Sequence, residues 1–222
     1  MPEASPLQDR SRLSDFATIF AHMWYRDFPL QRSLREKAQR ADWTTHIGIA
    51  VRSTADLMGL FTCFESGGRT DALLRDNSKN VVAALEWEWA ALHRGDTIIN
   101  EFNKLKDLCT KSEFKEICFA GLIGYARESS SRAKADRADY GSLLAEVLEG
   151  YTNRWPLEGP PLLLVLVHFE NAGKAKDRQT RKFTKLTLHR IRGQSSELLR
   201  EQPACPWDVP GSRWAHETRN GA

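Results

Sequence analysis

The sequence predicts an α/β protein in which a mixed β-sheet is flanked by helices. Three observations support this prediction. Apolar residues recur at helical spacing over about residues 14–58, and the period changes to two over residues 60–89, as expected for half-buried strands. Residues 162–169 are almost continuously apolar, which is typical of a central strand covered on both faces. Helices and strands in this mixed order form layered α/β domains.

Helical patterns occupy the N-terminal part of the chain. Ser14 can cap a helix whose apolar residues follow at intervals of three and four, and Pro29 ends it. A second, basic helix is expected over residues 30–40. A third helix covers residues 42–58 and ends at Gly59, because glycine is the preferred residue just after a helix.

Three strands, a helix and a fourth strand are expected next. The first two strands, residues 60–65 and 69–74, form a hairpin around two glycines, and a polar turn leads to a third strand over residues 80–89. A helix over residues 96–109 carries an apolar stripe on one face. Residues 116–125 form the fourth strand.

The C-terminal part adds a helix and two strands. Residues 127–139 are polar and lack apolar periodicity, which indicates a loop, and a helix follows over residues 140–151. Two strands, residues 162–169 and 183–191, enclose a basic hairpin loop. The tail from Gln194 contains three prolines and is expected to be irregular.

Composition excludes several classes of protein. The 222 residues include 32 Lys and Arg against 29 Asp and Glu, and a net charge of +3 does not identify a partner. The start of the chain lacks the apolar run of a secretory signal, and no apolar segment approaches the length that crosses a bilayer. Four scattered cysteines fit neither a zinc ribbon nor a disulfide framework. We expect a cytoplasmic protein with no membrane partner. Its single domain comprises a helical extension (1–41), an α/β part (42–193) and an irregular tail (194–222).

Carboxylates gather on the second and third strands. The period of two places Glu86 and Glu88 on one face of the third strand, and a hairpin register can bring Asp71 beside Glu86. Close carboxylates repel one another unless a cation lies among them, and oxygen ligands suit Mg²⁺ or Mn²⁺. The alternative is that Glu86 and Glu88 form the solvated face of an alternating strand.

The helix that follows the third strand carries Glu101 and Lys104, three residues apart. Both flank the apolar stripe, so Lys104 points along the sheet side of the helix. A lysine there can orient a water molecule or stabilise the charge that develops on a phosphate, while a metal ion lowers the pKa of the water. These residue types together indicate phosphodiester hydrolysis.

The order of these residues resembles that of the PD-(D/E)XK nuclease superfamily, which has the restriction endonuclease-like fold. The resemblance is carried by the segments Arg69-Thr70-Asp71, Ala84-Leu85-Glu86-Trp87-Glu88 and Glu101-Phe102-Asn103-Lys104-Leu105. The core of that fold is a helix, a three-strand meander, a helix and a strand, which matches the order expected here from residue 42 to residue 125. The resemblance implies a restriction endonuclease-like core with extra N-terminal helices.

The resemblance also implies roles for individual residues. Asp71 and Glu86 would be ligands of Mg²⁺ or Mn²⁺, and Glu88 would assist as a ligand or base. The sequence departs from the motif at Thr70, which replaces a proline, and at Glu88, which stands where the signature lysine is expected. Some members of the superfamily carry that lysine on the neighbouring helix, where Lys104, held by Glu101, is the candidate.

A cluster of basic residues is expected to bind nucleic acid, because lysines and arginines that contact phosphates release counterions. Its members are Lys174, Lys176, Arg178, Arg181, Lys182, Lys185 and Arg190. The sequence thus predicts a metal-dependent nuclease that hydrolyses phosphodiester bonds, with DNA as the preferred substrate. The alternative is a catalytically decayed module of the same fold that binds nucleic acid or a protein partner. We leave a homodimer open.

Overall fold

A seven-stranded mixed sheet lies between two helical layers in the described part of the chain. The computed structural model describes residues 6–27, 40–66, 70–91, 96–114, 116–127, 148–171, 181–205 and 209–211. The helices are α1 (Pro6–Asp27), α3 (Arg40–Leu57), α4 (Asp96–Thr110), the 3-10 turn η1 (Ser112–Phe114) and a short helix over residues 148–154. The strands are β1 (Phe61–Ser66), β2 (Thr70–Arg75), β3 (Val81–Ala91), β4 (Phe119–Arg127), β5 (Leu162–Asn171), β6 (Arg181–Arg192) and β7 (Ser195–Pro203).

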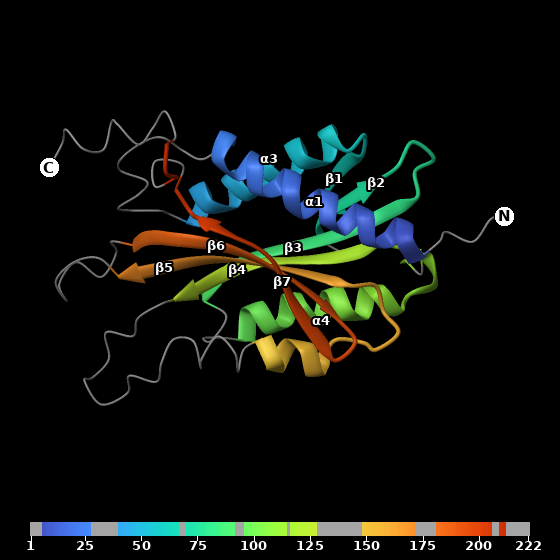
Figure 1. The fold of residues 1–222 in the computed structure, drawn as a ribbon. Coiled ribbons are helices and arrows are strands. Elements are labelled where there is room, and N and C mark those ends of the chain that lie inside the picture. The colour runs from blue at the N-terminus through green and yellow to red at the C-terminus, as the bar shows by residue number, and fades with distance from the viewer. Residues whose placement is uncertain are drawn as a thin grey trace, which may run out of the picture.

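The strands lie side by side in the order in which they occur along the chain. β1, β2 and β3 are antiparallel to one another, β4 is parallel to β3, and β5 is parallel to β4. β6 and β7 continue the sheet in antiparallel pairing. A parallel pair requires a crossover connection. α4 supplies it between β3 and β4, and so this helix packs directly against β3 (Figure 1).

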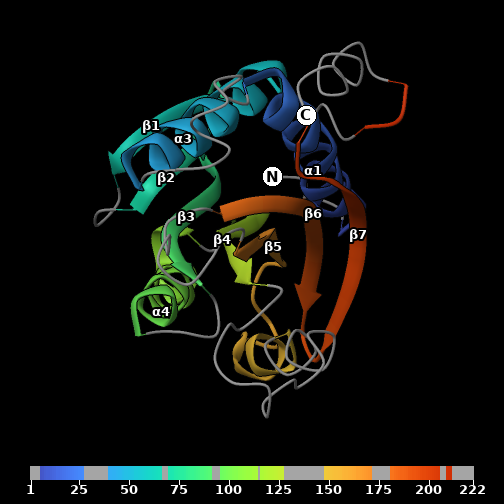
Figure 2. The same cartoon turned by 90° about the vertical axis from the view of Figure 1, so that its left-hand side faces the viewer.

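Each face of the sheet has its own apolar core. α1 and α3 cover one face, while α4 and residues 148–154 cover the other (Figures 1 and 2). Alternate residues of β3 divide between the cores: Leu85 and Trp87 belong to the first, whereas Ala84 belongs to the second. Glu86 therefore points towards the α4 side, as the period of two predicts. β5 is buried from Leu162 to His168, which confirms a central strand covered on both faces.

The N-terminal helix is part of the core rather than an appendage. Leu13, Phe16 and Phe20 of α1 are fully buried. Trp24 donates a hydrogen bond from its ring nitrogen to the carbonyl oxygen of Ala204 at 2.7 Å, just beyond β7. The C-terminal end of α1 thus packs against the segment that follows β7.

The structure differs from the sequence prediction in the tail. We expected residues 194–222 to be irregular, but Ser195–Pro203 forms β7 at the edge of the sheet. Its first four residues are exposed, so the strand carries no regular apolar alternation and is held by backbone pairing with β6. The expected helix over residues 30–40 and the expected loop over residues 127–139 fall almost wholly outside the described residues.

Gly121 is required where β4 passes β3. A Cβ atom at this position would lie 3.0 Å from Cδ2 of Leu85, which is fully buried and cannot move aside freely. We predict that Gly121→Val lowers the free energy of unfolding by about 1–3 kcal/mol, the range of overpacked cores. Urea denaturation measures this change.

The matched control for this prediction is Gly150→Ala, in the short helix over residues 148–154. An added Cβ there has no heavy atom within 4 Å, so the exchange should be neutral or stabilise the fold by up to about 1 kcal/mol. Equal stability of Gly121→Val and the wild type would contradict the packing account.

Candidate functional site

Asp71 and Glu86 face each other across the pairing of β2 with β3. The last regular pair at this end is Ala72 with Leu85, so the next residues along the two strands are Asp71 and Glu86. The backbone N–H of Trp87 donates to Oδ2 of Asp71 at 2.8 Å, and the backbone N–H of Asp71 donates to Oε2 of Glu86 at 3.4 Å. The carboxylates thus accept backbone hydrogen bonds where the regular ladder ends, which fixes their orientation.

Lys104 reaches this pair from α4. Its Nζ lies 2.7 Å from Oε1 of Glu86 and 3.2 Å from Oε2 of Glu101. The side chain of Glu86 is fully buried, whereas those of Lys104 and Glu101 are 30% and 23% exposed. Glu101 and Lys104 lie one turn apart on the helix, so the ammonium group bridges α4 and β3. These two side chains form the partly exposed side of the cluster.

Burial dominates the electrostatics of the site. It raises the pKa of Glu86 to about 9, because the charged form loses its hydration, although Lys104 opposes the shift. Burial also raises the pKa of Asp71, against the lowering effect of the Trp87 N–H group. Partial burial lowers the pKa of Lys104, but the interactions with Glu86 and Glu101 together outweigh this effect and raise the pKa above its usual value. A nearby cation would therefore stabilise the charged forms of these two carboxyl groups.

The burial of Glu86 excludes one interpretation of the third strand. A solvated face of an alternating strand would leave this carboxylate in water, but Glu86 is 0% exposed. Glu88 follows two positions later on the same face and is half-buried. Glu86 is thus an interior carboxylate whose charge requires partners, while Glu88 lies nearer the surface.

The donor set determines which metal the site could hold. Within the described residues, no group of three or more His, Cys, Asp or Glu side chains is arranged for a metal ion. Asp71 and Glu86 nevertheless present adjacent carboxylates, held by backbone hydrogen bonds. Mg²⁺ is commonly held by one or two carboxylates together with water and substrate phosphates, so this pair fits a hard divalent cation that shares its ligands with a substrate.

The expected nucleic-acid-binding residues are only partly described. Lys174, Lys176 and Arg178 lie outside the described residues, as do the side chains of Arg181 and Lys182. The remaining two residues contact acids. Nζ of Lys185 lies 3.3 Å from Oε2 of Glu201, and Arg190 forms an ion pair with Glu197. Both acids belong to β7. These acidic neighbours were not predicted from the sequence, because Ser195–Pro203 was expected to be irregular.

A buried polar group on β5 and β6 also escaped the sequence interpretation. The hydroxyl of Thr187 lies 2.8 Å from Nε2 of His168 and 3.0 Å from Nε2 of His189. Burial lowers the pKa of both histidines, to about 3 for His168 and about 4 for His189. The histidines stay neutral near pH 7 and share one hydroxyl, an arrangement that satisfies buried polar atoms in the sheet.

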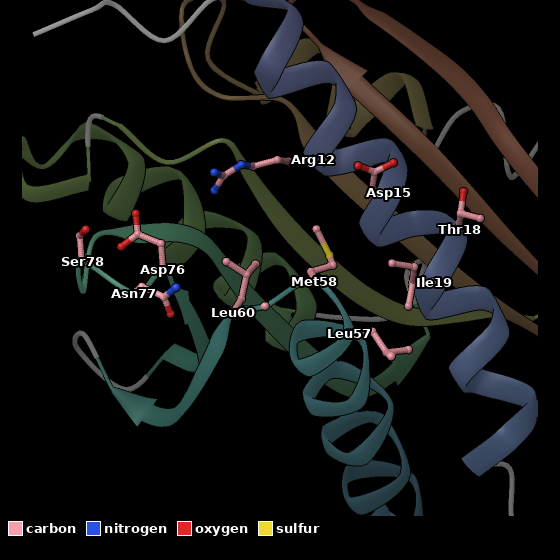
Figure 3. Close-up of a pocket in the computed structure, with 11 residues that line it drawn as sticks. Arg12, Asp15, Thr18, Ile19, Leu57, Met58, Leu60, Asp76, Asn77 and Ser78 are labelled. Carbon is pink, nitrogen blue, oxygen red and sulfur yellow. The ribbon is translucent and has the colours of Figure 1, made fainter.

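One hollow in the described part of the molecule lies away from the carboxylates. It has a volume of about 730 Å³ and is bounded by α1, the end of α3 and the turn between β2 and β3 (Figure 3). Arg12 and Asp15 line it from α1, and Asp76 lines it from the turn. The carboxylate of Asp76 accepts hydrogen bonds from the backbone and side-chain nitrogens of Asn80, at 2.9 and 3.1 Å. Asp76 therefore stabilises a turn, and we place the candidate site at the opposite end of β2.

Comparisons with known proteins do not identify a family. No protein-family model matches the sequence, and no curated protein matches it. One solved structure, "The Crystal Structure of YaeQ Protein from Xanthomonas axonopodis pv. citri", is similar over 65% of this chain and 70% of that chain, at 10% sequence identity. The TM-score is 0.23, which is too low to establish a common fold. No helix in the described ranges has the length and apolar character needed to span a membrane.

The raised pKa of Glu86 predicts how stability depends on pH. Between the ordinary value of 4.5 and about 9, the folded protein retains a proton that the unfolded chain has lost. Raising the pH therefore favours unfolding in this window. From pH 7 to pH 9, the wild type should lose stability relative to Glu86→Gln, by at most about 1.4 kcal/mol per pH unit.

Urea denaturation across this pH range provides the measurement. Glu149→Gln, which alters an exposed carboxylate in the short helix over residues 148–154, is the control and should follow the wild type. If the free energies of unfolding of the wild type and Glu86→Gln changed with pH in the same way, the raised pKa of the buried Glu86 would be contradicted.

Proposed function

We propose that the protein is a metal-dependent nuclease that hydrolyses phosphodiester bonds, with DNA as the preferred substrate. The observation that carries the proposal is the fully buried carboxylate of Glu86, which lies beside Asp71 on one side and 2.7 Å from the Lys104 ammonium on the other. A buried charge is costly unless it is paired, so a fold keeps such a group only with compensating interactions. Perturbed acids next to a partly exposed lysine are typical of functional sites.

Asp71 and Glu86 are the residues that would hold Mg²⁺ or Mn²⁺. Their donor atoms are oxygens only, which suits these hard cations and not zinc in its usual nitrogen and sulfur environments. When bound, the cation would polarise the phosphate and lower the pKa of a water molecule. The backbone N–H of Trp87 holds the Asp71 carboxylate at 2.8 Å and so keeps one ligand oriented.

The remaining roles fall to side chains of α4 and β3. Lys104 is a partly exposed positive charge beside the carboxylates, placed to stabilise negative charge that develops on a phosphate. Glu101 contacts its Nζ at 3.2 Å and positions it. Glu88, half-buried on the same face as Glu86, would act as a base. In this proposal the core is restriction endonuclease-like, with the signature lysine supplied by the helix.

Cleavage assays test the proposal. The purified protein should cleave plasmid or single-stranded DNA in the presence of Mg²⁺ or Mn²⁺. Glu86→Gln and Asp71→Asn should each reduce the rate at least about 100-fold, the scale of losing one group that stabilises charge in a transition state. Glu149→Gln, an exposed acid outside the site, should retain full activity. Equal cleavage by Glu86→Gln and the wild type would overturn the assignment.

A second function, nucleic-acid binding without cleavage, is favoured by one observation. Glu88 occupies the position of the signature lysine and adds an acid to the carboxylate side of the site. A decayed module of this kind would bind DNA in EDTA, with an affinity that falls steeply with salt. Replacing Arg181 and Lys182 by alanine would then weaken binding and reduce the dependence on salt.

A further inference from the structure

We propose that Lys104 and a divalent cation compete for the carboxylate of Glu86, so that binding of the cation displaces the lysine towards solvent, where it can contact a substrate phosphate. The inference rests on the proposed function, because it takes the Asp71 and Glu86 pair as the cation site. It adds a regulatory step to that site: the lysine that stabilises phosphate charge leaves Glu86 only when the metal is bound.

The distances around Oε1 of Glu86 carry the inference. Lys104 Nζ lies 2.7 Å from this oxygen. Mg²⁺ binds carboxylate oxygens at about 2.0–2.1 Å, so a cation and the ammonium on the same oxygen would lie within about 5 Å of each other. Charges of +2 and +1 at this separation repel strongly in a partly buried site. A cation on Glu86 thus disfavours the observed position of Lys104.

Lys104 has a second position available without unfolding any part of α4. Glu101 lies one turn earlier on the same helix and already contacts Nζ at 3.2 Å. The lysine side chain is 30% exposed, and its four-carbon stem is flexible. Rotation about the stem can move the ammonium away from Glu86 while it keeps Glu101 as a partner. Glu101 is thus the positioning residue for the displaced lysine.

Chemical labelling of lysines in the wild-type protein tests this displacement. Sulfo-NHS-acetate acetylates accessible amines, and mass spectrometry quantifies each site with and without Mg²⁺. We expect acetylation of Lys104 to rise several-fold with Mg²⁺ and to return to its initial level in EDTA. Lys111, exposed just after α4, is the internal control and should not change. Unchanged or reduced labelling of Lys104 would overturn the inference.

The affinity for Mn²⁺ gives a second readout that does not depend on activity. Lys104→Met removes the competing charge and should bind Mn²⁺ several-fold more tightly than the wild type in isothermal titration calorimetry. Lys106→Met, two residues along α4, is the matched control and should bind as the wild type does. Equal or weaker binding by Lys104→Met would contradict competition.

The two proposals fail in different ways. Mn²⁺ binding and DNA cleavage with no displacement of Lys104 would remove only the competition and leave the nuclease assignment intact. Absence of Mn²⁺ binding in the wild type and in both lysine variants, together with absence of cleavage, would remove the metal site and with it both proposals.

Discussion

The candidate site depends on the cost of burying one carboxylate. Glu86 is 0% exposed in the middle of a sheet, and burial raises its pKa to about 9. A group in this position needs hydrogen-bond donors and positive charge around it. Its surroundings supply both: the Asp71 N–H group from β2 and the Lys104 ammonium from α4. These neighbours offset part of the cost of burying the carboxyl group.

The topology explains how three distant segments meet at this carboxylate. β2 and β3 are antiparallel neighbours, so their register places Asp71 opposite Glu86. β4 is parallel to β3, which requires a crossover, and α4 provides it on the face to which Glu86 points. Phe102 and Leu105 are buried against that face, which fixes the rotation of α4. This rotation directs Lys104 and Glu101 towards the carboxylates.

Much of this arrangement could be predicted from the sequence, since it depends on local periodicity. The alternation along β3 separates Glu86 from Leu85, and the apolar run of β5 marks a central strand. β7 could not be predicted in this way, because an exposed edge strand is held by its backbone and its side chains show no regular pattern. The ion pair of Lys185 with Glu201 was missed for the same reason, since it joins β6 to that strand. Periodicity also does not reveal burial, so the sequence left two interpretations of Glu86 open.

The central claim is that Asp71 and Glu86 together hold a divalent cation. Anomalous diffraction from crystals grown with Mn²⁺ tests it most directly, because the signal locates the metal independently of activity. The account predicts a peak about 2 Å from a carboxylate oxygen of each residue, with Lys104 turned away from Glu86. A Mn²⁺ peak elsewhere in the molecule, with Lys104 still paired to Glu86, would contradict it.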